Sequence, residues 1–158
     1  MAYCNKILFS LISFCWFSCA PADQSVAGHF VKFQSPGIVN LNIGKASIVV
    51  LKFHIKKGYH IMAFSEKEDH FIPSQISFES QEGIEIKAVE FPKPYDYFIE
   101  GIDAPLSVLE DQIKIEVQIV VDKKGKQKIE GNFRYQACDD RKCFFPKDLA
   151  FSLEIEAN

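Results

Sequence analysis

Apolar and polar side chains alternate along most of this chain, with the period of two that is typical of β-strands. The alternation is cleanest in residues 84–89 and recurs in residues 112–121 and 128–137. No stretch shows a convincing amphipathic helical spacing. The chain is therefore predicted to be all-β.

Seven or eight short strands separated by regular turn signals predict an immunoglobulin-like β-sandwich, with a small barrel as the alternative. Two hairpins are expected, one joining residues 46–55 to 59–63 and one joining 112–121 to 128–137. Pro92 and Pro94 exclude a ladder strand between 91 and 94. Further strands are expected at 29–33, 75–79, 84–89 and 151–156, and an irregular surface segment at 95–109.

The first 22 residues have the features of an export signal. Lys6 precedes an apolar run from 7 to 17, which is shorter than the roughly 20 residues that a membrane-spanning helix needs. Ala20–Ala22 fits the small-x-small rule, so the preferred mature start is Asp23, and lipid attachment at Cys19 is the alternative. The remaining residues 23–158 are enough for a single domain, which we expect in the periplasm.

Charge gives no sign of a nucleic-acid partner. The formal net charge is -3, and a cluster of four lysines, at 123, 124, 126 and 128, falls on an expected turn rather than on a continuous basic patch. We expect no nucleic acid among the partners.

Only Cys138 and Cys143 remain after removal of the signal. A structural bridge over so short a loop contributes only about 2 kcal/mol in the chain-entropy model, against roughly 3 for a loop of 15 residues. Exposed or strained disulfides are also the reducible ones, so the residues alone leave a redox pair and a structural bridge both open. A metal site would need further ligands from His54, His60 or His70, and we expect neither a metal nor another cofactor.

The charges between the two sulfurs differ in sign. Asp139 and Asp140 follow Cys138, whereas Arg141 and Lys142 precede Cys143. Because positive neighbours favour a thiolate and negative ones disfavour it, Cys143 is predicted to be the better nucleophile.

The run Tyr135–Asp140, together with Cys143 and Pro146, resembles the signature of the N-terminal periplasmic domain of the thiol:disulfide interchange protein DsbD. Residues 54–61, 72–74 and 91–94 resemble that family's early strand-turn-strand, its next strand entry and the bend before its cap loop. The similarity runs from about Ala46 to the end of the chain.

The resemblance implies an immunoglobulin-like domain in which Cys138 and Cys143 are catalytic and Cys143 forms the mixed disulfide. It implies a thioredoxin-like or membrane electron-transfer protein as reductant and oxidised exported proteins as clients. It also implies a cap loop, matched here by residues 96–98, with Phe98 as the candidate aromatic or, alternatively, a core filler. The expected site residues are Cys138, Cys143, Asp96, Tyr97, Phe98, Tyr135, Gln136, His60 and Phe144.

The chain departs from the family pattern at several points. Its cysteine loop is one residue shorter than in the best-known members, and His60 and Met62 stand where the family has aromatics. The chain ends at Asn158, so we expect a separate protein to reduce it. Loop 94–105 and the aromatics Tyr135, Phe144 and Phe145 are expected to select substrates.

The activity expected from these residues is that of a thiol-disulfide oxidoreductase of the protein-disulfide reductase type. The rival interpretation is a non-enzymatic immunoglobulin-like binding module with a structural disulfide, because sandwich domains host many functions. The reduction potential of the pair distinguishes the two.

Overall fold

The structure, a computed structural model, describes residues 30–64, 71–98 and 104–158. The expected export signal, with Cys19 and the mature start at Asp23, lies outside these residues, as does His70. Within the described ranges, no helix has the length and apolar character needed to cross a membrane.

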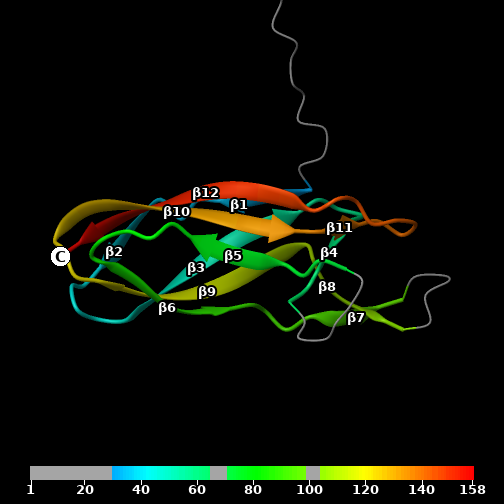
Figure 1. Ribbon diagram of the computed structural model, residues 1–158, viewed down its shortest axis with the longest axis horizontal. Helices are drawn as coiled ribbons and strands as arrows, with labels where there is room; N and C mark the ends of the chain where they lie inside the picture. Colours follow the sequence, from blue (N-terminus) through cyan, green and yellow to red (C-terminus); the bar gives the residue numbers. More distant parts are fainter. Residues whose placement is uncertain (1–29, 65–70, 99–103) are drawn as a thin grey trace, which may run out of the picture.

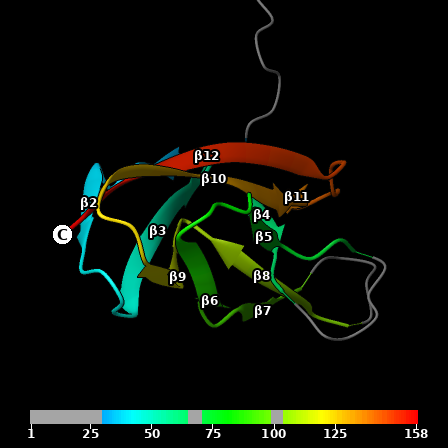
Figure 2. The ribbon, with the colours of Figure 1, turned by 60° about the vertical axis from the view of Figure 1, so that its left-hand side comes forward.

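Two four-stranded sheets form the body of the molecule (Figures 1 and 2). The first sheet has the order β1 (Val31–Gln34), β3 (Ser47–Ile55), β9 (Gln112–Val121) and β6 (Ile84–Glu90). The second has the order β2 (Ile38–Leu41), β12 (Lys147–Ala157), β10 (Gly125–Tyr135) and β5 (Gln75–Phe78). All neighbours are antiparallel except β2, which runs parallel to β12.

A third sheet lies at the end of the sandwich opposite the C-terminus (Figure 1). Its order is β11 (Ala137–Cys138), β4 (His60–Met62), β8 (Leu106–Glu110) and β7 (Tyr95–Tyr97). Strand β11 follows β10 after one residue, and β8 precedes β9 after one residue, so the long strands of the sandwich hold this small sheet in place. It carries the two cysteines.

The inward faces of the two large sheets pack against each other. Phe53 of β3 meets Phe133 of β10 with ring centroids 4.5 Å apart, and Phe151 of β12 meets Phe53 edge to face at 5.6 Å. Every second residue is buried along β9, from Ile129 onward in β10 and from Phe151 onward in β12, as the alternation predicts. Full burial of one such side chain stabilises the fold by about 1.5–3 kcal/mol. The expected all-β, immunoglobulin-like sandwich is confirmed.

Gly131 of β10 shows how closely the layer is packed. A β-carbon at this position would clash with the ring of Phe151 on the neighbouring strand β12. Gly131 and Phe151 are directly opposed in the register of the two strands, and Phe151 uses the space that the glycine leaves.

Both expected hairpins are wrong, although the strands and turns themselves form. Strand β3 pairs with β1 and β9, whereas β4 pairs with β8 and β11. The physical reason is that β4 is buried on both faces, with Ile61 in the main core and Met62 in the small cluster around Cys138, and the third sheet provides this position. Likewise β9 and β10 belong to opposite sheets, because both have a buried face that packs across the sandwich rather than edge to edge.

Two further expectations need correction. Residues 95–109 were expected to be irregular, but they contain β7 and β8, and Leu106 and Val108 of β8 point into a buried cluster. Strand β2 was not expected. It is short and its Ile38 is 58% exposed, so its alternation gave little signal.

Candidate redox site

Cys138 and Cys143 form a disulfide across a short hairpin. The two residues are antiparallel bridge partners with α-carbons 3.9 Å apart. Backbone hydrogen bonds enclose the pair on both sides, from Phe144 N to Ala137 O (2.8 Å) and from Asp139 N to Lys142 O (2.9 Å). The cysteines therefore occupy a non-hydrogen-bonded position of the ladder, where opposed side chains come closest.

The loop between the sulfurs is ordered by its first aspartate. Asp139 Oδ1 accepts hydrogen bonds from the backbone amides of Arg141 (2.9 Å) and Lys142 (2.8 Å). These amides hold the pKa of Asp139 below its ordinary value. An aspartate that caps its own turn in this way is a common turn device, and it makes a four-residue loop sufficient here.

The two sulfurs differ in accessibility. Cys138 is fully buried in a small apolar cluster with Met62, Leu106 and Val108, while Cys143 at the edge of this cluster is only half-buried. An incoming group therefore meets Cys143 before it meets Cys138. The greater exposure of Cys143 is compatible with the prediction from the neighbouring charges that Cys143 is the better nucleophile.

Tyr97, not Phe98, packs against the cysteine cluster. Its hydroxyl donates a hydrogen bond to Asp140 Oδ1 at 2.7 Å, which joins β7 to the cysteine hairpin and raises the pKa of Tyr97. Phe98 is 74% exposed, so the alternative that it fills the core is wrong. Asp96 is exposed on the same strand, and residues 99–103 of the expected substrate-selecting loop lie outside the described part of the chain.

His60 lies directly beside Cys138, because the two residues are partners in the register of β4 and β11. Its side chain is buried, with 2% exposed, and its ring lies 4.2 Å from that of Tyr97. Burial lowers the pKa of His60, while the nearby carboxylates of Glu110, Asp140 and Asp139 raise it to a lesser extent.

Gln136 fastens the hairpin to the rest of the domain. Its Nε2 donates to Phe144 O (3.1 Å), and its Oε1 accepts from the amide of Ile72 (2.7 Å). Its backbone carbonyl accepts from the amide of Met62 (3.0 Å). Gln136 thus links both sides of the cysteine hairpin to β4 and to the segment before β5.

Two expected site aromatics belong to the main core instead. Tyr135 is fully buried within the sandwich, and burial raises the pKa of its hydroxyl. Phe144 is half-buried against Phe30, with ring centroids 4.7 Å apart. Strand alternation places Tyr135 of β10 inward. Phe144 and Phe145 lie between the cysteine bridge and β12, and Phe145 is 89% exposed.

The two histidines that the structure describes, His54 and His60, lie in different sheets. His54 is exposed on β3 and contacts Gln34 (2.8 Å) and Gln112 (3.1 Å), whereas His60 is buried in the third sheet. Among the residues that the structure describes, no three His, Cys, Asp or Glu side chains are grouped as metal ligands would be.

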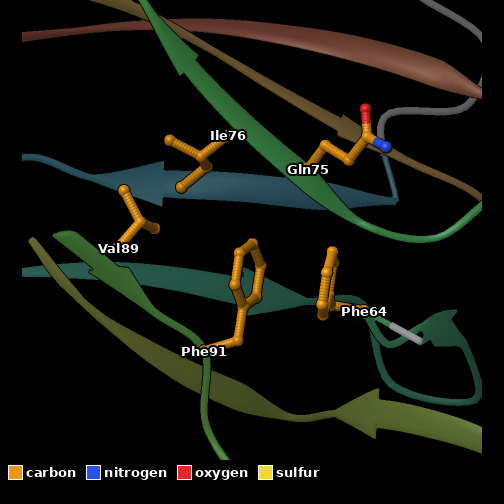
Figure 3. Close-up of a pocket in the computed structure, with 5 residues that line it drawn as sticks. All are labelled: Phe64, Gln75, Ile76, Val89 and Phe91. Carbon is orange, nitrogen blue, oxygen red and sulfur yellow. The ribbon is translucent and has the colours of Figure 1, made fainter. Parts of the chain in front are cut away.

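A separate apolar groove of about 230 Å³ lies at the open side of the sandwich, between the edge strands β5 and β6 (Figure 3). Figure 3 shows Ile76 and Gln75 on one side and Val89 and Phe91 on the other, with Phe64 at one end. It contains none of the residues around the disulfide.

Fold and site together define an immunoglobulin-like domain with one buried and one reachable cysteine. The family model for the N-terminal domain of the thiol:disulfide interchange protein DsbD matches residues 30–155, and the chain belongs to this family. Membership assigns the domain to thiol-disulfide interchange with thioredoxin-like redox partners, and the DsbD N-terminal domain is a periplasmic domain.

The chain is also similar to solved structures of such domains. The N-terminal periplasmic domain of ScsB from Proteus mirabilis is 13% identical with a TM-score of 0.53, over 78% of this chain and 44% of that one. The reduced N-terminal domain of DsbD from Neisseria meningitidis is 13% identical with a TM-score of 0.47, over 68% of this chain and 76% of that one. No curated protein matches the chain.

Proposed function

We propose that this domain carries reducing equivalents in the periplasm, after export by residues 1–22, from a thioredoxin-like or membrane electron-transfer partner to oxidised exported proteins. Under this proposal it is a thiol-disulfide oxidoreductase that needs no cofactor. The observation that carries the proposal is the unequal exposure of the two sulfurs, since Cys143 is half-buried and Cys138 is fully buried. A bridge with only a structural role gains nothing from this difference.

The exchange proceeds through Cys143. A thiolate of the reduced partner attacks Cys143 Sγ, a bond forms between these sulfurs, the bond to Cys138 breaks, and the electron pair goes to Cys138, which takes up a proton. The partner's second thiolate then attacks its own sulfur in the mixed disulfide. Cys143 is released as a thiolate, and the partner leaves oxidised.

The reduced domain then acts on its client. Cys143 attacks the client disulfide, which breaks and leaves one client sulfur as a thiolate. Cys138 loses its proton and attacks Cys143 in the new mixed disulfide. The disulfide of the domain forms again, and the client leaves with both of its cysteines reduced.

Access to the sulfurs is controlled by β7. Tyr97 packs on the cluster and is tied to the hairpin through Asp140, so this strand acts as the cap. Phe98 and Phe145, which are 74% and 89% exposed, offer apolar contacts to a docking partner. The cap and the exposed aromatics serve different steps: the first protects the disulfide and the second selects the partner.

The test is the reduction potential of the Cys138–Cys143 pair, combined with trapping. A potential between about -270 and -180 mV, within reach of thioredoxin-like partners, is expected for a carrier. A potential below about -300 mV would instead favour the binding module with a structural disulfide. The Cys138→Ser variant should accumulate a mixed disulfide when its Cys143 thiolate attacks the disulfide of a client or of the oxidised partner, and Cys143→Ser should not. Accumulation by the opposite variant would overturn the assignment of Cys143.

A further inference from the structure

His60 has a buried nitrogen that lacks a hydrogen-bond partner in the oxidised domain. Its Nε2 has no hydrogen-bond partner among the residues that the structure describes. Only 2% of the residue is exposed. An unpaired buried polar group costs about 1–3 kcal/mol, so its presence calls for a physical reason. The register supplies one, because His60 is directly opposed to Cys138 in the ladder.

Opposed residues on neighbouring antiparallel strands have β-carbons about 4.5–5.5 Å apart and point to the same face of the sheet. The imidazole of His60 is therefore expected beside the side chain of Cys138. The ring of Tyr97 packs on this imidazole, with the two ring centroids 4.2 Å apart. In the disulfide, the Cys138 sulfur carries no hydrogen. Reduction creates an S–H group on this sulfur, in the residue directly opposed to His60.

We propose that His60 accepts the proton of Cys138 when the reduced domain closes its disulfide again, and returns it when the disulfide opens. This rests on the proposed function and adds to it the residue that handles the proton of the buried sulfur. In the closing step, the S–H proton moves to His60 Nε2 as the Cys138 sulfur attacks Cys143. The bond between Cys143 and the client sulfur breaks, and the client leaves as a thiolate.

The surroundings suit this role. Burial lowers the pKa of His60, so the imidazole is neutral and able to accept a proton near neutral pH. The carboxylates of Glu110 on β8 and of Asp139 and Asp140 on the hairpin stabilise the imidazolium that forms. Tyr97 on β7 faces the same ring and keeps its own proton, because Asp140 raises the pKa of its hydroxyl. A thiolate at Cys138 would be buried in a cluster with Met62, Leu106 and Val108, which disfavours its charge.

The test uses the reduced domain and one equivalent of an aromatic disulfide that releases a coloured thiolate. The first release reports attack by Cys143, and the second reports closure by Cys138. The variant His60→Phe keeps an aromatic ring against Tyr97. Near neutral pH its second release should be about tenfold slower or more, and the midpoint of the pH dependence of this release should be raised. The first release should not change. The control His54→Phe makes the same substitution at the exposed histidine of β3, away from the cysteine cluster, and should leave both releases unchanged.

A second measurement does not depend on exchange. In Cys143→Ser, the pKa of the Cys138 thiol is obtained from its thiolate absorbance, with His60 intact or replaced. His60→Phe should raise this pKa, and His60→Gln, whose amide still donates a hydrogen bond, should raise it less. Equal values in all three proteins would overturn the inference. If His60 alters the pKa but Cys143 never releases the first thiolate, the inference stands and the carrier function fails.

Discussion

The hydroxyl of Tyr97 donates a 2.7 Å hydrogen bond to Asp140, and this contact closes the outermost strand of the third sheet over the cysteine hairpin. Asp140 lies in the loop between the two cysteines, so the cap is fastened to the same four residues that separate the sulfurs. Under the proposed function, in which β7 is the cap, opening of this strand and exposure of the disulfide are coupled. The predictions below follow from this arrangement.

Removing the Tyr97 contact should make the disulfide easier to reduce. Tyr97→Phe loses one exposed hydrogen bond of about 0.5–1 kcal/mol and should speed reduction by dithiothreitol two- to fivefold. Tyr97→Ala also uncovers the cluster and should speed it further. Thiol trapping over time measures both rates. Phe98→Ala is the matched control and should have little effect, and an equal acceleration in this control would assign the covering role to Phe98.

Gln136→Ala should destabilise the domain by about 2 kcal/mol, because two side-chain hydrogen bonds are lost and the amide of Ile72 is left without its partner. Urea unfolding of the oxidised protein measures the change. Asn132→Ala, on the preceding strand β10, removes one exposed hydrogen bond to Asp148 and should cost less than 1 kcal/mol. Equal costs for the two variants would contradict the role given to Gln136.

The oxidised domain should lose stability as the pH falls below about 6.5. Burial lowers the pKa of His60 in the folded state, so the unfolded chain binds a proton that the folded chain does not. The contribution of His60 to the free energy of unfolding is complete above its pKa in the unfolded chain and is lost as the pH falls through its lower pKa in the folded domain. Free energies of unfolding at about pH 7.5 and about pH 5 should differ more in the native protein than in His60→Phe. Asp139 titrates at more acid pH, because its pKa is lowered.

Phe145→Ala should slow exchange with a thioredoxin-like protein while leaving reduction by dithiothreitol unchanged. An exposed aromatic that anchors a partner contributes about 1–2 kcal/mol, which corresponds to roughly a tenfold change in rate. Because Phe145 is 89% exposed, its removal should change stability by less than about 0.5 kcal/mol. The control is Ile48→Ala, which removes an exposed apolar side chain near the start of β3. A loss of rate with both reductants would indicate a local disturbance rather than lost docking.

The alternation of side chains was enough to place most strands and to separate inward from outward residues. The strands around residues 47–55, 112–121 and 84–90 form as expected, because one buried face requires a period of two. Strand partners could not be read in this way. A turn such as that between β9 and β10 can lead back along the same sheet or across to the other, and only packing between the layers decides.

The sequence by itself pointed to the two chemical groups of the site, because Cys138 and Cys143 are the only cysteines outside the segment expected to be an export signal. It also determined the sign of the charges around them. Only the tertiary structure decided which sulfur is buried, that Tyr97 rather than Phe98 covers the pair, and that His60 faces Cys138. The reason is physical: these properties depend on strands β4, β7 and β8, which are far from the cysteines in sequence and meet them only through sheet pairing.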